Sequence, residues 1–152
     1  MIGLLQRVDG AAVEVDGREI ARIGKGLLVL VGVERGDDER TCDRLLERLA
    51  SYRVFADDAG RMNLSVTDAG GGLLLVPQFT LAADTSQGLR PGFSRAAPPG
   101  DAERLFAYMA KRAEKRLPGA QTGRFGAPMR VSLINDGPVT FWIRVPPHYA
   151  AE

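Results

Sequence analysis

The segment Val-Pro-Gln-Phe-Thr-Leu at residues 76–81 combines a bend with groups that could bind a ligand. Pro77 follows a four-residue apolar run and has no N–H to donate, so we expect ladder hydrogen bonding to end there. The bend can turn the following backbone N–H groups toward a ligand as an oxyanion hole, where losing one donor typically lowers the rate ~10²–10³-fold. Phe79 offers a flat face for a base or sugar, and Thr80 offers a hydroxyl. The alternative is an ordinary strand end, with Phe79 and Leu81 in the core.

A second segment, Asn-Asp-Gly-Pro-Val-Thr at residues 135–140, is typical of a turn between two strands. Gly-Pro is one of the few dipeptides that can adopt a cis peptide bond, although only ~5–6% of X–Pro bonds in folded proteins do. Pattern alone therefore favours a trans bond in a hairpin turn.

A cluster of basic residues is the third candidate for a functional site. Four of them recur at helical spacing on one predicted polar face: Lys111, Arg112, Lys115 and Arg116. Others precede and follow that face, namely Arg90, Arg95, Arg124 and Arg130. Such a cluster suits a nucleic-acid backbone. A solvated helix face without a ligand is the alternative.

Several chemistries are excluded by residue type. One cysteine, Cys42, and one histidine, His148, leave no disulfide, no Cys-cluster or paired-His metal site, and make a Ser-His-Asp triad improbable. We interpret Cys42 as a small buried hydrophobe, and Asp57-Asp58 as part of a turn. The triplet at residues 70–72 matches neither glycine-rich phosphate-binding motif. An enzyme with this sequence is expected to work without a metal, a cofactor or the usual side-chain base.

Length and composition describe an ordinary globular protein. The 152 residues, 45% of them hydrophobic and 26% charged, predict one domain over residues 1–152, with 146–152 a flexible tail. The net charge of +1 argues against a strongly basic nucleic-acid-binding protein. No segment reaches the ~18–20 apolar residues of a membrane span, and the first seven residues do not resemble a signal peptide. We therefore expect a cytoplasmic protein.

Hydrophobic periodicity predicts two helices among about eight strands. The helices are expected at residues 37–52 and 101–117. Strands are expected at residues 1–9, 12–15, 20–23, 26–33, 53–55, 73–76, 121–125, 129–134 and 139–145. Asp16-Gly17 predicts a hairpin between the segments at 12–15 and 20–23. The run at 26–33 is continuously apolar and predicts a central strand covered on both faces. Residues 83–99 are predicted to form a long, functional loop. The fold class is therefore α/β.

Six blocks in order along the chain resemble the D-aminoacyl-tRNA deacylase family. They are Gln-Arg-Val at 6–8, the apolar run at 26–33, Met-Asn-Leu-Ser-Val at 62–66, Gln-Phe-Thr-Leu-Ala-Ala-Asp-Thr at 78–85, Thr-Gly-Arg-Phe-Gly-Ala at 122–127, and the segment at 135–140. The resemblance implies a single compact domain with mixed β-sheets in a barrel-like core. It also implies a homodimer whose subunits complete each other's active sites.

The resemblance further implies hydrolysis of D-aminoacyl-tRNA, and of mischarged glycyl-tRNA, with L-aminoacyl-tRNA rejected. Gln78, Phe79 and Thr80 would line the pocket for the terminal adenosine and the ester. Backbone N–H groups of Phe79 and Thr80 would be the oxyanion donors. Gly137-Pro138 would be a cis dipeptide that enters the partner's pocket and acts as the chirality filter. Arg7, Pro77, Asn135 and Thr140 would support these groups, and the 2′-hydroxyl of the terminal ribose would assist the attacking water.

One residue departs from the family pattern, which has serine at the position of Pro77. The Pro-Gln pair resembles a sister family of tRNA deacylases that has a trans Gly-Pro and looser chirality. Phe79, Arg7 and the block at 135–140 favour the D-specific family. Two alternatives remain: a non-catalytic tRNA-binding module, and a freestanding relative of synthetase editing domains that acts on another mischarged tRNA.

Overall fold

A computed structural model describes residues 1–147, so residues 148–152 of the predicted tail, His148 included, lie outside the described residues. The elements in chain order are β1 (Ile2–Val15), β2 (Arg18–Ile23), β3 (Gly26–Gly32), α1 (Glu39–Ser51), β4 (Phe55–Ala56), β5 (Met62–Leu64), β6 (Gly72–Pro77), the 3₁₀ turn η1 (Phe79–Ala82), α2 (Pro99–Arg116), β7 (Gln121–Thr122) and β8 (Arg130–Arg144). In the described part of the chain, no helix is long and apolar enough to cross a membrane.

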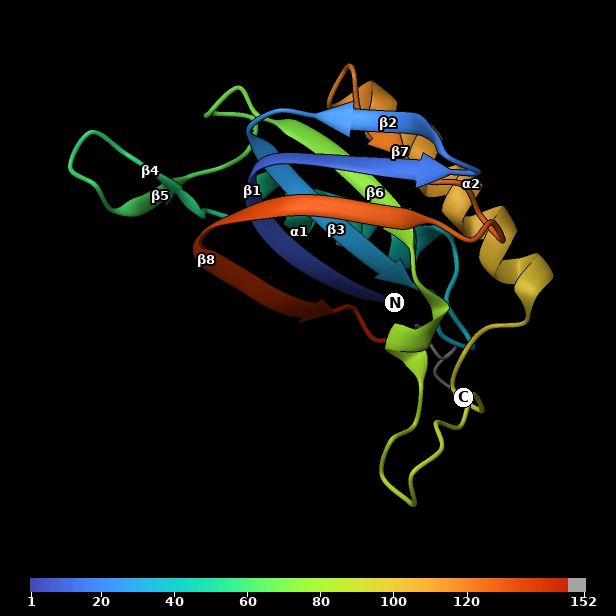
Figure 1. Ribbon diagram of the computed structural model, residues 1–152. Helices are drawn as coiled ribbons and strands as arrows, with labels where there is room; N and C mark the ends of the chain where they lie inside the picture. The colour runs from blue at the N-terminus through green and yellow to red at the C-terminus, as the bar shows by residue number, and fades with distance from the viewer. Residues whose placement is uncertain (148–152) are drawn as a thin grey trace.

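One long strand, β1, organises the main sheet (Figure 1). The sheet has the order β2-β1-β3-β6-β7. β8 pairs with β1 along the edge of β1 opposite to β2 and β3. The first half of β1 lies between β3 and β8, whereas its second half lies between β2 and β8. The β3–β6 and β6–β7 pairs are parallel. The sheet folds over as β1 changes neighbours, which produces the barrel-like shape.

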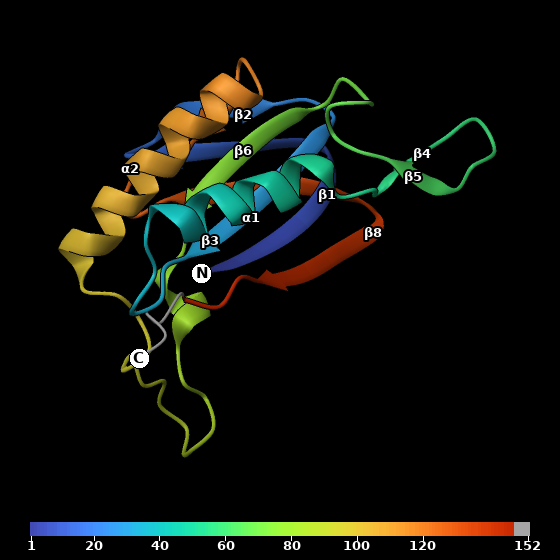
Figure 2. The same cartoon turned by 180° about the vertical axis from the view of Figure 1, so that it is seen from behind.

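Two hydrophobic cores fill the two sides of this sheet. Both helices cover one side (Figure 2), where Leu27 and Val29 of β3 pack with helix residues such as Leu45 and Leu105. Leu28 points the other way, into a second core inside the folded sheet. The prediction that the apolar run at 26–33 is a strand covered on both faces is therefore confirmed.

Local sequence signals explain several element boundaries. Asp16-Gly17, with φ of 51° and 76°, makes the predicted hairpin between β1 and β2. Asp38 caps α1 in a capping box with Thr41, whose backbone N–H donates to the Asp38 carboxylate at 3.0 Å. Cys42 is buried as predicted, and its burial raises the pKa of the thiol to about 12.

The prediction of a hairpin turn at residues 135–140 is wrong, because the two flanking segments do not pair with each other: both belong to β8 and pair with the same strand, β1. The chain bends there as part of the folded sheet, together with β1 (Figure 1). From Gln6 to Val8, β1 advances two residues, while its partners on β8 run five residues, from Thr140 to Asn135. The extra residues bulge out of the ladder, since turn-forming residues suit a bulge as well as a hairpin. Likewise, the segments expected at 1–9 and 12–15 form one strand.

Candidate active site

The bend after β6 comes one residue later than Pro77. Pro77 still pairs with Val31 in the parallel ladder, and the backbone N–H of Gln78 donates to the Val31 carbonyl at 2.7 Å. The expectation that ladder bonding ends at Pro77 is therefore wrong, because the next residue supplies the donor that proline lacks. The chain then turns into η1.

The turn η1 exposes its first residues to solvent. Phe79 is 59% exposed, so the alternative that placed its ring in the core is wrong. Thr80 is exposed too, and its hydroxyl accepts a hydrogen bond from the Gln78 side-chain amide. The Gln78 N–H is already used by Val31, and the Leu81 N–H donates to the Gln78 carbonyl at 3.3 Å. The N–H groups of Phe79 and Thr80 fall in the first turn, where a helix offers no acceptor.

Two glycines, which sequence analysis did not single out, let other strands approach this segment. A Cβ on Gly32 of β3 would lie 2.9 Å from the Leu81 Cβ and 3.1 Å from the Gln78 carbonyl oxygen. A Cβ on Gly123 would lie 3.4 Å from Pro77 Cδ, and 2.8 Å from the Met129 sulfur, which belongs to a flexible side chain that can shift. At Gly32 the neighbouring atoms are a backbone oxygen and a Cβ, which cannot shift in this way, so the packing of η1 depends on Gly32. Sequence alone gave no signal beyond the presence of glycine.

The loop predicted at residues 83–99 brings a second aromatic ring to η1. Asp84 and Gly92 exchange two backbone hydrogen bonds, of 2.7 and 2.9 Å, which close the base of the loop. The ring of Phe93, which follows directly, lies 5.1 Å from the ring of Phe79 and is 40% exposed. Phe93 is a site residue that sequence analysis missed, because its approach depends on how the loop closes.

The bulge in β8 presents an exposed dipeptide. The Gly137–Pro138 peptide bond is cis, and both residues are exposed. Gly137 has φ of 140°, and a Cβ there would lie 2.7 Å from a Val139 methyl carbon. The Asn135 side chain accepts from the Val139 N–H at 2.7 Å and donates to the Thr140 hydroxyl at 2.8 Å. These hydrogen bonds connect the residue before the dipeptide segment to the residues that follow it.

Arg7 of β1 anchors this bulge through hydrogen bonds of its guanidinium group. Its Nε donates to the Asp136 carbonyl at 3.0 Å, and its Nη1 donates to the Val54 carbonyl at 2.7 Å. The side chain is only 15% exposed and also makes an ion pair of 3.4 Å with the Asp136 carboxylate. The structure therefore brings Arg7, Asn135 and Thr140 to the dipeptide. Their supporting role in catalysis stays a prediction.

The dipeptide and η1 lie at opposite ends of β3. Gly32, at one end, contacts η1. Gly26, at the other end, pairs with Val8, and Val8 also pairs with Asn135. Six strand residues at ~3.3 Å each separate the two ends by about 20 Å. One chain therefore does not bring its own dipeptide to its own η1.

The four basic residues of α2 do not form a single free surface. Arg112 makes an ion pair of 3.1 Å with Asp43 of α1, and Arg116 one of 3.5 Å with Glu47. Lys111 and Lys115 are exposed. Helix packing thus neutralises half of the predicted cluster, and its contact with tRNA stays a prediction.

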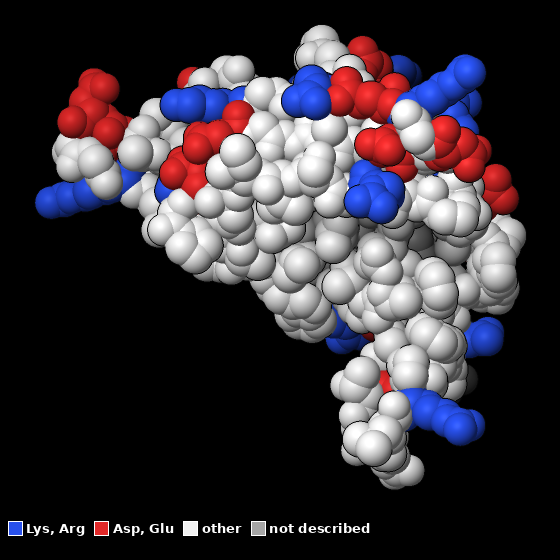
Figure 3. Space-filling model, viewed as in Figure 1, with Lys and Arg blue, Asp and Glu red and all other residues white. Residues whose placement is uncertain are grey.

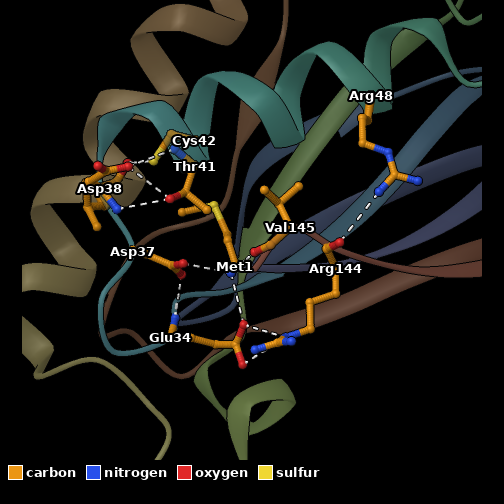
Figure 4. A network of polar contacts seen from close by, with 10 residues as sticks. Met1, Glu34, Asp37, Asp38, Thr41, Cys42, Arg48, Arg144 and Val145 are labelled. Carbon is orange, nitrogen blue, oxygen red and sulfur yellow. Dashed lines mark hydrogen bonds and ion pairs between the residues drawn. The ribbon is translucent and has the colours of Figure 1, made fainter. Parts of the chain in front are cut away.

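A buried ionic network joins the start of β1 to the end of β8 (Figure 4). The Met1 amine donates to Glu34 at 3.0 Å, to Asp37 at 2.8 Å and to the Val145 carbonyl at 2.7 Å. Arg144 donates to Glu34 at 2.9 Å. Burial raises the pKa of Glu34, but these hydrogen bonds outweigh it and hold the pKa below its usual value. Among residues 1–147, no cluster of three or more His, Cys, Asp or Glu could hold a metal.

A sequence model of the family described as D-Tyr-tRNA(Tyr) deacylase matches residues 4–144. The chain belongs to this family. The predicted family and the predicted enzyme class, a hydrolase of the aminoacyl-tRNA ester bond, are confirmed. A D-aminoacyl-tRNA deacylase of Thioalkalivibrio sulfidiphilus is 59% identical over 147 residues, covering 97% of this chain and 99% of the relative. One of Glaesserella parasuis serovar 5 is 59% identical over 145 residues, covering 95% and 100%.

Solved structures confirm the predicted fold class. The c-Myc DNA Unwinding Element Binding Protein matches this family member with a TM-score of 0.92 at 34% identity, covering 96% of this chain and 99% of that one. A probable eukaryotic D-amino acid tRNA deacylase matches with a TM-score of 0.78 at 15% identity, covering 93% and 98%, which shows the shared fold alone.

Proposed function

We propose that this chain hydrolyses the ester between a D-amino acid and the terminal ribose of tRNA, releasing both, in the cytoplasm. The observation that carries the proposal is the exposed turn η1, where the first-turn N–H groups of Phe79 and Thr80 stand beside an exposed ring. Relatives 59% identical over nearly the whole chain bear the name of this activity.

The proposed chemistry relies on backbone groups rather than on a side-chain base. An aminoacyl ester is already activated, so positioning and oxyanion stabilisation supply much of the catalysis. Water attacks the ester carbonyl carbon, and the N–H groups of Phe79 and Thr80 stabilise the charge that develops on the carbonyl oxygen. In one concerted relay, the ribose 2′-hydroxyl accepts a proton from the attacking water as it passes its own proton to the departing 3′-oxygen. Neither a metal nor a cofactor takes part.

Chirality, in this proposal, is read by the carbonyl groups of Gly137-Pro138 from a second subunit. The dipeptide of one chain lies about 20 Å from its own η1, so a two-fold dimer would place two equivalent dipeptides in two equivalent pockets. Because main-chain atoms ignore side-chain identity, many D-amino acids would be accepted. Glycine has no side chain to exclude, so glycyl-tRNA would be hydrolysed too.

The surface of β8 supports a dimer. Among the strands of residues 1–147, β8 pairs only with β1, so it is an edge strand, and edge strands favour association with another chain. Ile134 and Trp142 on this strand are 66% and 58% exposed. Figure 3 shows an uncharged area over the middle of this face, with the charged side chains mostly around its margin. Exposed apolar side chains on an uncharged face are typical of an interface.

Hydrolysis of D-Tyr-tRNA and L-Tyr-tRNA, each with and without a chelator, tests the proposal. We expect release of D-tyrosine to be far faster than that of L-tyrosine and insensitive to the chelator. Equal rates on both would contradict the chirality filter and place the activity with the sister family. Binding without turnover would indicate a tRNA-binding module, and preference for one L-aminoacyl ester an editing-domain relative.

A further inference from the structure

A hollow of about 520 Å³ opens directly beside η1. The end of η1 and the residues after it, Leu81–Ala83, form one wall, and the loop residues Ser94 and Arg95 form another. Arg35, which lies beyond the end of β3, and Trp142 of β8 also line the hollow. Since Leu81 directly follows Thr80, the hollow begins within one 3₁₀ turn of the proposed oxyanion donors.

Two arginines are held side by side at this hollow. The backbone N–H of Arg35 donates to the Arg95 carbonyl at 2.9 Å, and the Arg35 Nε donates to the Ser94 carbonyl at 2.9 Å. A guanidinium carries five N–H donors, so this side-chain bond orients Arg35 while its terminal nitrogens keep donors for a ligand. The exposed Arg95 side chain adds a second cation.

The acidic residue of the hollow does not cancel these charges. The Glu34 carboxylate is buried and already accepts hydrogen bonds from Arg144 at 2.9 Å and from the Met1 amine at 3.0 Å (Figure 4). Its negative charge is therefore balanced within the protein. Asp84, which follows Ala83, offsets part of the Arg95 charge: hydrogen bonds from Ser86 and, to a smaller extent, the nearby Arg95 lower the pKa of its carboxyl. The two arginines against this one carboxylate still leave the hollow with a net positive charge.

We propose that this hollow binds a backbone phosphate of the RNA strand, on the 5′ side of the nucleotide whose ester lies at η1. The guanidinium fork suits phosphate oxygens. The exposed rings of Phe79 and Phe93 belong to the two segments that wall the hollow. Aromatic rings beside cations are the means by which proteins hold single-stranded nucleic acid. The proposal rests on the proposed function and adds a substrate contact to it.

The test compares D-tyrosyl-tRNA with the 3′-ester of D-tyrosine and adenosine, which has no phosphate. We expect Arg35→Gln and Arg95→Gln each to lower kcat/KM for the tRNA substrate about tenfold, the effect of one lost charge-assisted contact. The adenosine ester should be cleaved as by the wild type. The matched control is Arg18→Gln, which removes one exposed charge from β2. Arg18 pairs with Val15, at the opposite end of β1 from Ile2, so this variant should change neither rate.

Salt dependence provides a second readout with tRNA alone. The slope of log kcat/KM against log salt concentration should become less negative by ~0.7 for each lost phosphate contact, which is the value per contact for single strands. Unchanged kinetics on tRNA would overturn the phosphate site, and so would an equal loss on both substrates, which would mean that the arginines only shape η1. A wild-type chain that cleaves neither substrate would overturn the proposed function itself, and this site with it.

Discussion

The guanidinium of Arg7 donates to the carbonyl of Asp136 at 3.0 Å, one residue before the Gly137–Pro138 dipeptide. A second hydrogen bond, to the Val54 carbonyl, ties the same side chain to the segment that leads into β4. Arg7 therefore bridges three parts of the chain at the place where β8 leaves the ladder. Lysine cannot reproduce this bridge, because it lacks the planar fork.

We expect Arg7→Lys to lower kcat/KM for D-Tyr-tRNA about tenfold, since a charge-assisted bond that positions the dipeptide is lost. The melting temperature should fall by a few degrees, because lysine keeps the charge beside Asp136 but leaves the Val54 carbonyl without its donor. Arg22→Lys is the control, since Arg22 pairs with Glu19 on the exposed surface of β2. Wild-type kinetics for Arg7→Lys would show that the bridge does not position the dipeptide.

Pro77 can be replaced, because its place in the ladder needs no donor from it. We expect Pro77→Ser to keep most of the deacylation rate, since the Gln78 bond to Val31 and the N–H groups of Phe79 and Thr80 remain. Single-turnover hydrolysis of D-Tyr-tRNA measures this. A thousandfold fall would instead show that the proline itself sets the geometry of η1.

Nucleophilic attack by Thr80 and assistance by the ribose 2′-hydroxyl predict opposite results for two experiments. The Thr80 hydroxyl accepts from the Gln78 amide and has no activating base beside it in the sequence, so it is a weak nucleophile. Thr80→Ala should keep substantial activity, because its backbone N–H survives. A tRNA ending in 2′-deoxyadenosine should lose most of the rate at comparable binding.

The reverse result would identify Thr80 as the nucleophile: an inactive Thr80→Ala variant together with normal cleavage of the 2′-deoxy substrate. Measuring tRNA binding alongside both rates separates a chemical defect from a binding defect.

Local signals predicted the parts of the fold that depend on neighbouring residues. Asp16-Gly17 marked the hairpin, and the apolar run at 26–33 marked the central strand. The bulge at residues 136–139 could not be predicted from the segment itself, because its shape depends on pairing with β1. The Phe79–Phe93 contact depends on closure of a loop, and the pairing of Arg112 with Asp43 depends on helix packing. Long-range contacts of this kind leave no local pattern.

The central claim is that the dipeptide of one subunit filters substrates for the η1 of its partner. Two variants separate these parts. Phe79→Pro removes both the backbone N–H donor and the aromatic ring of this residue. Proline is tolerated at this position because it is the first residue of η1. The preceding residue, Gln78, has a non-helical φ of −144° and ψ of 86°, which is compatible with a following proline. Gly137→Ala forces a Cβ against Val139 and should displace the filter. The first homodimer should be inactive, whereas the second should hydrolyse both D- and L-Tyr-tRNA.

Coexpression of the two variants, with the Phe79→Pro chain in ninefold excess, is the most direct test of this claim. Nearly every Gly137→Ala chain then pairs with a partner that carries an intact dipeptide. Per Gly137→Ala chain, hydrolysis of L-Tyr-tRNA should fall to about one tenth while hydrolysis of D-Tyr-tRNA persists, the result of random pairing in a two-fold dimer. Hydrolysis of L-Tyr-tRNA that stays unchanged in dimers of confirmed mixed composition would contradict the claim, because each chain would then be filtering its own substrate.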